Sequence, residues 1–392
     1  MKLVKLFTSV AVLAVMALCM SFKGVDSYGG KHPRLFIFVE NGKMGFMDNT
    51  GKTVIEARYS SLGNFSEGMA CMMRDGKWGF LDTNGNEVIK PQFDGTGGFQ
   101  DGMAMVWSEE LPDDSDWEVY RYGFVDKNGK VVRKPQFYAA YDFSEGLAAV
   151  FVEEEDDGKW GYIDRSGKIV IEPQFDEAWM FHEGLAAVRV GDKETGKEGF
   201  IDRTGRFVIE PQFASVGNFS EGLAMVRIEG PDGRKYGYID KNGSIVIAPQ
   251  YDEVRPFENG IAKVKIGTGW RERWGCIDKT GNVVVPIQYE VVMDFSEGLA
   301  AVKTAGRWGF IDGKGFFVID PQYKQAGSFS DGLAMVKVGN KNGYIDHNGK
   351  MVIDTLYDAA SAFEDGMAWV RKDNMAMYIN TSGQIVRQWK QE

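Results

Sequence analysis

The chain has 392 residues, with 56 acidic against 45 basic side chains and a formal net charge of −11. An acidic chain is repelled by phosphate backbones and by anionic lipid surfaces, so its charge argues against partners of either kind. Only one apolar run, near the N-terminus, stands out, and no other segment is long and apolar enough to span a bilayer. Composition and charge are compatible with a binding protein and with an enzyme, so the distinction depends on the sequence motifs.

The first 21 residues have the features of a secretory signal peptide. Lys2 and Lys5 provide a positive start, and an unbroken apolar run covers residues 10–20. Such a run is too short to span a bilayer but has the length of a signal core. We therefore predict a signal peptide over residues 1–21, a linker over residues 22–33, and an exported chain that is periplasmic, cell-surface or extracellular. A retained membrane anchor is the alternative interpretation.

The rest of the chain repeats one pattern. A glycine behind an aromatic anchor recurs at Gly45, Gly79, Gly123, Gly161, Gly199, Gly237, Gly275, Gly309 and Gly343. A second glycine follows each of them after 23 residues, whereas the return interval is 11, 15 or 21 residues. These intervals differ by even numbers, which predicts a β-hairpin that lengthens at its tip, because an odd insertion would invert one arm. Such self-similarity predicts a single repeat domain over residues 34–390 with a degenerate last copy.

Each repeat predicts three short strands, as at residues 147–152, 160–164 and 168–171. Asp164 and the glycine three residues later indicate a tight turn in which the carboxylate bonds backbone N–H groups. A row of such acids that binds cations is the alternative. Pro173 is expected to end strand pairing. The segment 181–184, Phe-His-Glu-Gly, is expected to form one helical turn that a left-handed glycine ends.

The residues at 160–164, Trp-Gly-Tyr-Ile-Asp, and at 173–175, Pro-Gln-Phe, resemble the WG-repeat (KWG-repeat) proteins of bacteria. The resemblance covers residues 35–390, and its departures are local. Four residues replace the aromatic anchor and Cys276 replaces the Phe or Tyr after the glycine; the four are Met44, Glu198, Asn342 and Ala376. The resemblance implies a β-rich repeat scaffold and no particular catalytic activity.

We therefore predict an all-β fold, a tandem array of about ten three-stranded antiparallel β-meander repeats. The array begins with a first strand and finishes with a third strand, so no strand is left to be shared between its ends. Ten repeats also exceed the usual four to eight blades of a propeller. Both arguments favour an open, solenoid-like stack over a closed β-propeller.

The most distinctive feature outside the repeat is a run of acids in two long hairpins, flanked by tryptophans. A basic partner or Ca²⁺ could bind there. A solvated loop run that aids solubility is the interpretation we favour. The candidate partner-binding residues at hairpin tips are Trp107, Glu109, Asp113, Asp114, Asp116, Trp117, Glu154, Asp156 and Trp270.

No pattern places a histidine with a nucleophile or with other metal ligands, so we expect no catalytic site, no cofactor and no metal site. The predicted function is an exported, non-enzymatic scaffold that presents an extended surface to a protein or another macromolecule at or outside the cell envelope. The alternative is a glycan-binding module that uses aromatic residues across adjacent repeats. An enzyme would require one cleft lined by residues that break the repeat.

Overall fold

The computed structural model describes residues 34–110, 119–153, 158–230 and 233–390. The chain divides into two compact units, an N-terminal unit formed by residues up to 48 and 52–174, and a C-terminal unit formed by residues 49–51 and from 175 onwards. The predicted signal peptide and linker lie outside the described residues. Among the residues that the structure describes, no helix is long and apolar enough to cross a membrane.

The N-terminal unit holds one three-stranded and three four-stranded antiparallel sheets. Their strands are β1 (Phe36–Glu40), β2 (Lys43–Met47) and β3 (Thr53–Tyr59); β4 (Ser61–Ser66), β5 (Met69–Arg74), β6 (Lys77–Asp82) and β7 (Glu87–Phe93); β8 (Gly95–Gln100), β9 (Met103–Glu110), β10 (Val119–Asp126) and β11 (Val131–Phe137); and β12 (Ala139–Ala140), β13 (Leu147–Val152), β14 (Lys159–Asp164) and β15 (Ile169–Phe175).

The C-terminal unit holds six four-stranded sheets and one short 3₁₀ helix, η2 (Gly269–Arg271). Their strands are β16 (Glu177–His182), β17 (Leu185–Val190), β18 (Lys197–Asp202) and β19 (Phe207–Phe213); β20 (Ser215–Ser220), β21 (Leu223–Gly230), β22 (Gly233–Ile239) and β23 (Ile245–Tyr251); β24 (Glu253–Val254), β25 (Ile261–Ile266), β26 (Arg273–Asp278) and β27 (Val283–Tyr289); β28 (Val291–Val292), β29 (Leu299–Thr304), β30 (Arg307–Asp312) and β31 (Phe317–Tyr323); β32 (Gln325–Ser330), β33 (Leu333–Val338), β34 (Lys341–Ile345) and β35 (Met351–Tyr357); and β36 (Ala359–Ala360), β37 (Met367–Lys372), β38 (Met375–Asn380) and β39 (Ile385–Lys390).

The repeat therefore has four strands where three were predicted. The additional strand comes first in each four-stranded sheet and runs up to the segment that was expected to be a helical turn. That segment is instead a two-residue hairpin turn, as at Glu297 and Gly298, which have φ values of 52° and 85°. Ser296 and Leu299 pair across it. Two consecutive positive φ values are the requirement of a type I′ turn, whose twist matches the flanking strands.

The glycine behind the aromatic anchor is required by a β-bulge in the fourth strand. In the sheet of β30 and β31, Trp308 pairs with Tyr323 and Phe310 with Ile319, so the bulge lies opposite Gly309. A Cβ atom on Gly309 would lie 2.5 Å from the carbonyl oxygen of Ile319 and 2.7 Å from the nitrogen of Pro321. The proline sits inside the bulge, where its missing N–H is tolerated. The prediction that this proline ends the strand is wrong, since β31 continues to Tyr323.

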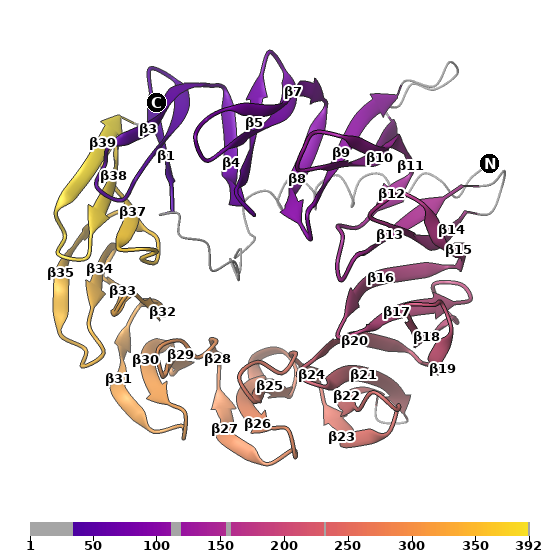
Figure 1. Ribbon diagram of the computed structural model, residues 1–392. Helices are drawn as coiled ribbons and strands as arrows, with labels where there is room; N and C mark the ends of the chain where they lie inside the picture. Colours follow the sequence, from indigo (N-terminus) through magenta and orange to yellow (C-terminus); the bar gives the residue numbers. More distant parts are fainter. Residues whose placement is uncertain (1–33, 111–118, 154–157, 231–232, 391–392) are drawn as a thin grey trace. The chain divides into compact units, whose positions relative to one another are not determined.

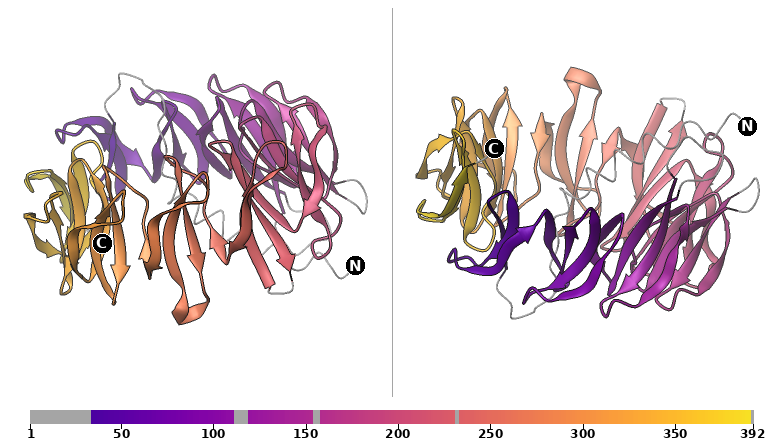
Figure 2. Two further views of the ribbon diagram at one scale, coloured as in Figure 1. Left: turned by 90° about the horizontal axis from the view of Figure 1, so that it is seen from below. Right: turned by 90° about the horizontal axis from the view of Figure 1, so that it is seen from above.

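The hydrophobic core lies between successive sheets. One cluster joins Phe46 and Ile55 of the first sheet to Ala70 and Met72 of the second, and all four side chains are buried. A single sheet could not bury these side chains alone, as expected of a repeat protein. In the C-terminal unit the sheets stand side by side, with the first strand of each on the concave side and the fourth on the convex side (Figures 1 and 2).

The turn at residues 49–51 packs against the last strand of the chain. The turn at residues 49–51 groups with the C-terminal unit, and a Cβ atom on Gly51 would lie 2.9 Å from Cγ1 of Val386 in β39. Gly167 lies in the same way against Val132 of the preceding sheet, where the corresponding distance to Cγ1 is 3.1 Å. The predicted open stack of three-stranded repeats is therefore wrong, and the sheets are the blades of a β-propeller. A shared strand is unnecessary, because the packing of a turn on the neighbouring fourth strand joins the last blade as it joins the others.

A second inter-sheet contact, which we call the corner clamp, involves the first residue of several type I′ turns. The carboxylate of Glu221 accepts a hydrogen bond from the backbone N–H of Gly260 in the next sheet, at 2.9 Å. It also forms an ion pair with Lys279, at 2.9 Å. Glu67 holds Gly102 and Lys127 in the same way, at 3.0 and 2.9 Å. The side-chain hydrogen bond of Lys279 lowers the pKa of Glu221. Each clamp ties the turn of one blade to the next.

Candidate functional site

The tip of the β25–β26 hairpin presents the most exposed large apolar side chain among the described residues, Trp270, which is 82% exposed. Trp270 lies in η2 and Arg271 covers its ring, 4.8 Å from the ring centroid. Nη1 of Arg273 donates a hydrogen bond to the carbonyl oxygen of Trp270 at 3.2 Å, and the N–H of Gly269 donates one to Oε1 of Glu272 at 3.2 Å. The exposed indole is thus carried by a tip whose backbone is held by its own side chains.

The base of this hairpin is fixed by Asp252, which follows the fourth strand of the preceding sheet. Its carboxylate accepts a hydrogen bond from the N–H of Gly267 at 2.7 Å and forms an ion pair with Lys235 at 2.7 Å. Burial opposes the charged form, but these hydrogen bonds outweigh it and lower the pKa of Asp252. Asp94, Asp176 and Asp358 cap other hairpins through the same kind of bond. The tip is therefore anchored to the sheet, and Trp270 has a rigid support.

Charged side chains surround a second tryptophan beneath the tip. Lys265 pairs with Glu253 at 2.6 Å and with Glu272 at 3.4 Å. The hydrogen bond to Glu253 raises the pKa of Lys265. Lys265 and Arg255 each lie 5.5 Å from the ring centroid of Trp274, which is half-buried. Trp274 therefore belongs to the framework under the tip, whereas Trp270 projects from it.

The other candidate residues fall in different surroundings. Trp107 lies in β9, half-buried over Gly95, with its ring 6.0 Å from that of Tyr122. Glu109 is exposed, and its N–H donates a hydrogen bond to Asp94 at 3.0 Å. Six candidates lie outside the described residues: Asp113, Asp114, Asp116, Trp117, Glu154 and Asp156.

The acids of the tight turns are engaged in their own turns. Oδ1 of Asp278 accepts hydrogen bonds from the N–H groups of Thr280 and Asn282, at 2.9 and 3.0 Å, and from the Thr280 hydroxyl at 2.6 Å. The hydroxyl bond is the largest cause that lowers the pKa of Asp278 to about 2. The prediction of turn capping is confirmed. Within the described residues, no three or more His, Cys, Asp or Glu side chains are grouped so that they could hold a metal ion.

The repeat anchors do not form an exposed aromatic row. Trp78, Trp160, Trp274 and Trp308 are each half-buried in the third strand of their sheets. Glu198 holds the anchor position in β18 and is 1% exposed, where it accepts a hydrogen bond from the N–H of Val216 at 2.7 Å and pairs with Arg189. This arrangement supports packing rather than a continuous platform for sugar rings.

A surface that the sequence did not predict runs along the fourth strands of the C-terminal unit. In β19 and β23 of two successive sheets, Val208 and Val246 are each more than 40% exposed. The preceding interpretation missed them because a valine in a strand suggests burial. The signal was the alternation of each valine with a buried isoleucine, as in Val208 and Ile209. Exposed apolar side chains in a row are typical of surfaces that contact other molecules.

A family model described as the WG containing repeat matches nine segments of the chain, residues 44–78, 78–106, 122–154, 160–193, 199–230, 236–270, 274–308, 308–341 and 343–375. The chain belongs to this family. The WG-repeat protein therefore repeats its defining motif across most of its length, as the resemblance in the sequence implied. No curated protein matches it.

Three solved structures resemble the WG-repeat protein in part. The tricorn protease is 11% identical with a TM-score of 0.26, over 82% of this chain and 38% of that chain. The extracellular domain of a putative hybrid two-component system from B. thetaiotaomicron is 11% identical with a TM-score of 0.24, over 92% and 65%. The acylaminoacyl peptidase of Pyrococcus horikoshii is 12% identical with a TM-score of 0.36, over 68% and 52%. The WG-repeat protein thus matches less than two thirds of each of these chains, and likeness at this level carries no inference about activity.

Proposed function

We propose that this WG-repeat protein is an exported scaffold that binds a protein or another macromolecule at or outside the cell envelope. The observation that carries the proposal is Trp270, 82% exposed on an anchored hairpin tip and flanked by Arg271. Tryptophan and arginine are enriched among the residues that contribute most to protein–protein binding. An exposed indole on a rigid tip also loses little conformational freedom when it is buried by a partner.

The hairpin tips suit this function for a second reason. They are the segments whose lengths differ between repeats, while the sheets beneath keep a constant spacing. Recognition residues are commonly carried by loops on a rigid scaffold. The fourth strands add a row of exposed valines that a large partner would also cover.

The test compares two exposed aromatic residues at different kinds of turn. The immobilised protein is exposed to an envelope extract of the cells that make it, and bound macromolecules are identified by mass spectrometry. The proposal expects a partner that the wild type and Phe316→Ala retain and that Trp270→Ala loses by tenfold or more, in the range of a hot-spot truncation. Phe316 is the matched control because it is 68% exposed in the β30–β31 turn. Equal binding by all three proteins would contradict a role for this tip.

Export is tested separately. Expression of the full chain followed by N-terminal sequencing of the mature protein is expected to show loss of about the first 20 residues. Recovery of the intact N-terminus in the cytoplasm would contradict export and leave the binding test unaffected.

A further inference from the structure

Successive sheets are joined by pairs of aromatic rings. The aromatic residue after the anchor glycine contacts the phenylalanine before the type I′ turn of the next sheet. Seven such pairs have ring centroids 4.7 to 5.0 Å apart: Phe46–Phe65, Phe80–Phe99, Phe124–Phe143, Phe200–Phe219, Tyr238–Phe257, Phe310–Phe329 and Tyr344–Phe363. The seam between the sheet of β24–β27 and the sheet of β28–β31 lacks such a pair. There, Cys276 replaces the first aromatic residue, and among the described residues Phe295 of the next sheet has no partner ring at that position.

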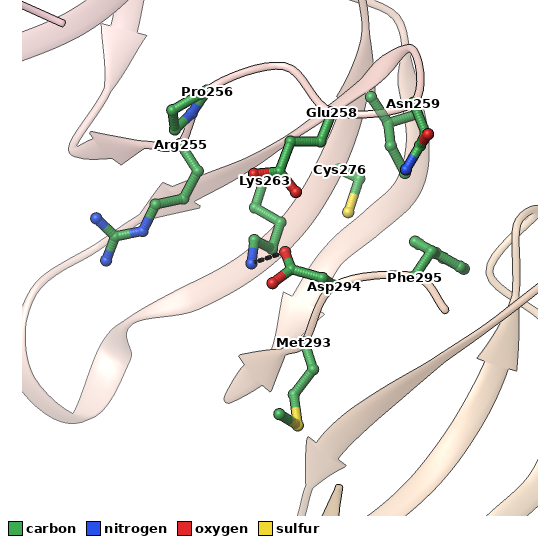
Figure 3. Close-up of a pocket in the computed structure, with 10 residues that line it drawn as sticks. Arg255, Pro256, Glu258, Asn259, Lys263, Cys276, Met293, Asp294 and Phe295 are labelled. Atoms are coloured by element: carbon green, nitrogen blue, oxygen red, sulfur yellow. Dashed lines mark hydrogen bonds and ion pairs between the residues drawn. The ribbon is translucent and has the colours of Figure 1, made fainter. Parts of the chain in front are cut away.

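A cleft of about 220 Å³ occupies this seam (Figure 3). Its lining includes Cys276 and Phe295 together with the charged residues Glu258, Lys263 and Asp294. Drug-sized ligands usually occupy pockets of about 300 to 1,000 Å³. This smaller cleft therefore suits a ligand of amino-acid size.

The charges around the cleft also depart from the repeat. The position of Lys263 is held in the other repeats by Cys71, Met105, Ala149, Ala187, Met225, Ala301, Met335 and Trp369. Lys263 forms an ion pair with Asp294 of the next sheet, and their side chains are 22% and 52% exposed. Glu258 and Arg255 line the same cleft. Groups of both signs thus surround a small cleft whose floor is apolar.

The corner clamp is missing at this seam as well. Asn259 holds the position of the clamp acid, and Gly313 holds that of the basic residue in the next sheet. Among the described residues, Asn259 forms no bond to the N–H of Gly298 of the kind that Glu221 forms to Gly260. The four departures, Asn259, Lys263, Cys276 and Gly313, therefore lie at one junction between two sheets. A cleft lined by residues that break the repeat is the feature that distinguishes a dedicated site from ordinary repeat packing.

We propose that this cleft binds a small zwitterion of amino-acid size, with its carboxylate at Lys263, its ammonium group at Asp294 and Glu258, and its apolar part over Cys276 and Phe295. A zwitterion matches the two signs of charge that the cleft presents, and charge-assisted hydrogen bonds to both ends would fix its orientation. The site is separate from the Trp270 tip, so it does not depend on the proposed macromolecular partner.

Cys276 acts here through its size. Its side chain is fully buried, and burial raises the pKa of the thiol to about 12, so the thiolate that would react is disfavoured. A larger residue would fill the cleft, whereas an alanine would keep it open. Cys276→Phe and Cys276→Ala are therefore a matched pair of variants, one that fills the cleft and one that leaves it open.

The test measures the thermal unfolding midpoint of the full-length protein with each of the 20 common free L-amino acids at about 10 mM, a concentration that detects binding in the millimolar range. The expected result is a rise of about 2 °C or more with at least one amino acid for the wild type and for Cys276→Ala. Cys276→Phe, which restores the aromatic residue of the repeat, and Lys263→Met, which restores a residue found in other repeats, are expected to lose that rise.

Two results would overturn the proposal. One is a wild type that no amino acid stabilises, and the other is a rise that persists in both Cys276→Phe and Lys263→Met. If Cys276→Phe does not fold, Lys263→Met decides alone, because its side chain is partly exposed and its replacement leaves the cleft floor intact.

Discussion

Gly51 of the β2–β3 turn packs against Val386 of β39, as Gly167 of the β14–β15 turn packs against Val132 of β11. Gly51 also has a φ of 84°, which disfavours any side chain. Two separate effects, backbone conformation and close approach, therefore require glycine at this position.

We expect Gly51→Ala to lower the free energy of unfolding by about 2–4 kcal/mol, because roughly 1–2 kcal/mol of left-handed strain is joined by a steric clash. Gly332→Ala is the control, since Gly332 has a φ of 78° and a Cβ atom added there would meet nothing within 4 Å. The Gly332→Ala variant should lose only the part of the free energy of unfolding that comes from backbone strain. Urea unfolding of both variants measures the difference, and equal losses would contradict tight packing of this turn on β39.

The two tryptophans of the β25–β26 hairpin should respond differently to truncation. Trp270→Ala should change the free energy of unfolding by less than about 0.5 kcal/mol, because the side chain is exposed. Trp274→Ala should lower it by about 2–3 kcal/mol, because Trp274 is half-buried under Lys265 and Arg255. Comparable losses in urea unfolding would mean that Trp270 has a structural role.

The missing corner clamp can be restored. We expect the double variant Asn259→Glu with Gly313→Lys to show a favourable coupling of about 0.5–1 kcal/mol relative to the two single variants, as for other partly exposed ion pairs. The coupling should weaken at about 1 M salt, because salt screens exposed charges. A double-mutant cycle in urea measures it, and a coupling near zero would show that this seam cannot accept a clamp such as that of Glu221.

Asp142 should make the protein more stable in mild acid. Oδ1 of Asp142 lies beside Gly97 and has no hydrogen-bond partner among the described residues, unlike the equivalent Asp294, which pairs with Lys263. Burial raises its pKa from near 4 to about 6. The folded state therefore holds the proton more tightly than the unfolded state, and the associated stability is lost as pH rises from about 4 to 6.

The variant Asp142→Asn isolates this contribution, since the amide has no charge to bury. The stability of the wild type relative to Asp142→Asn should fall by about 2 kcal/mol between pH 4 and pH 7. Urea unfolding at several pH values provides the measurement. A constant difference across this range would contradict a raised pKa at Asp142.

The sequence predicted the repeats, the second to fourth strands of each sheet and the variable hairpin, because these follow from glycine spacing and apolar periodicity. It did not predict the first strand. Residues such as 61–66, Ser-Leu-Gly-Asn-Phe-Ser, are polar and contain glycine, and a register irregularity between Leu62 and Phe65 disrupts the period of two. The packing of the 49–51 turn on β39 was also hidden, because it depends on the rotation between successive sheets and no local pattern encodes that angle.

The candidate sites were predicted in part. The position of Trp270 at a hairpin tip followed from the length of the variable segment, and its exposure is consistent with that placement. The cleft at Cys276 was not predicted, although Cys276 itself was recognised as a departure. Lys263 gave the same signal, but only the structure shows that Lys263 and Cys276 line one cleft with Asp294 of the next sheet.

The corner clamps have a consequence for how the protein comes apart. Each clamp acid holds backbone of the following sheet, so a sheet that opens also releases the turn of the sheet before it. Local unfolding would therefore spread between clamped sheets but not across the Asn259 seam, where no clamp transmits it. Proteases that attack partly opened chains should accordingly make their first cut close to this junction, where cooperativity is weakest.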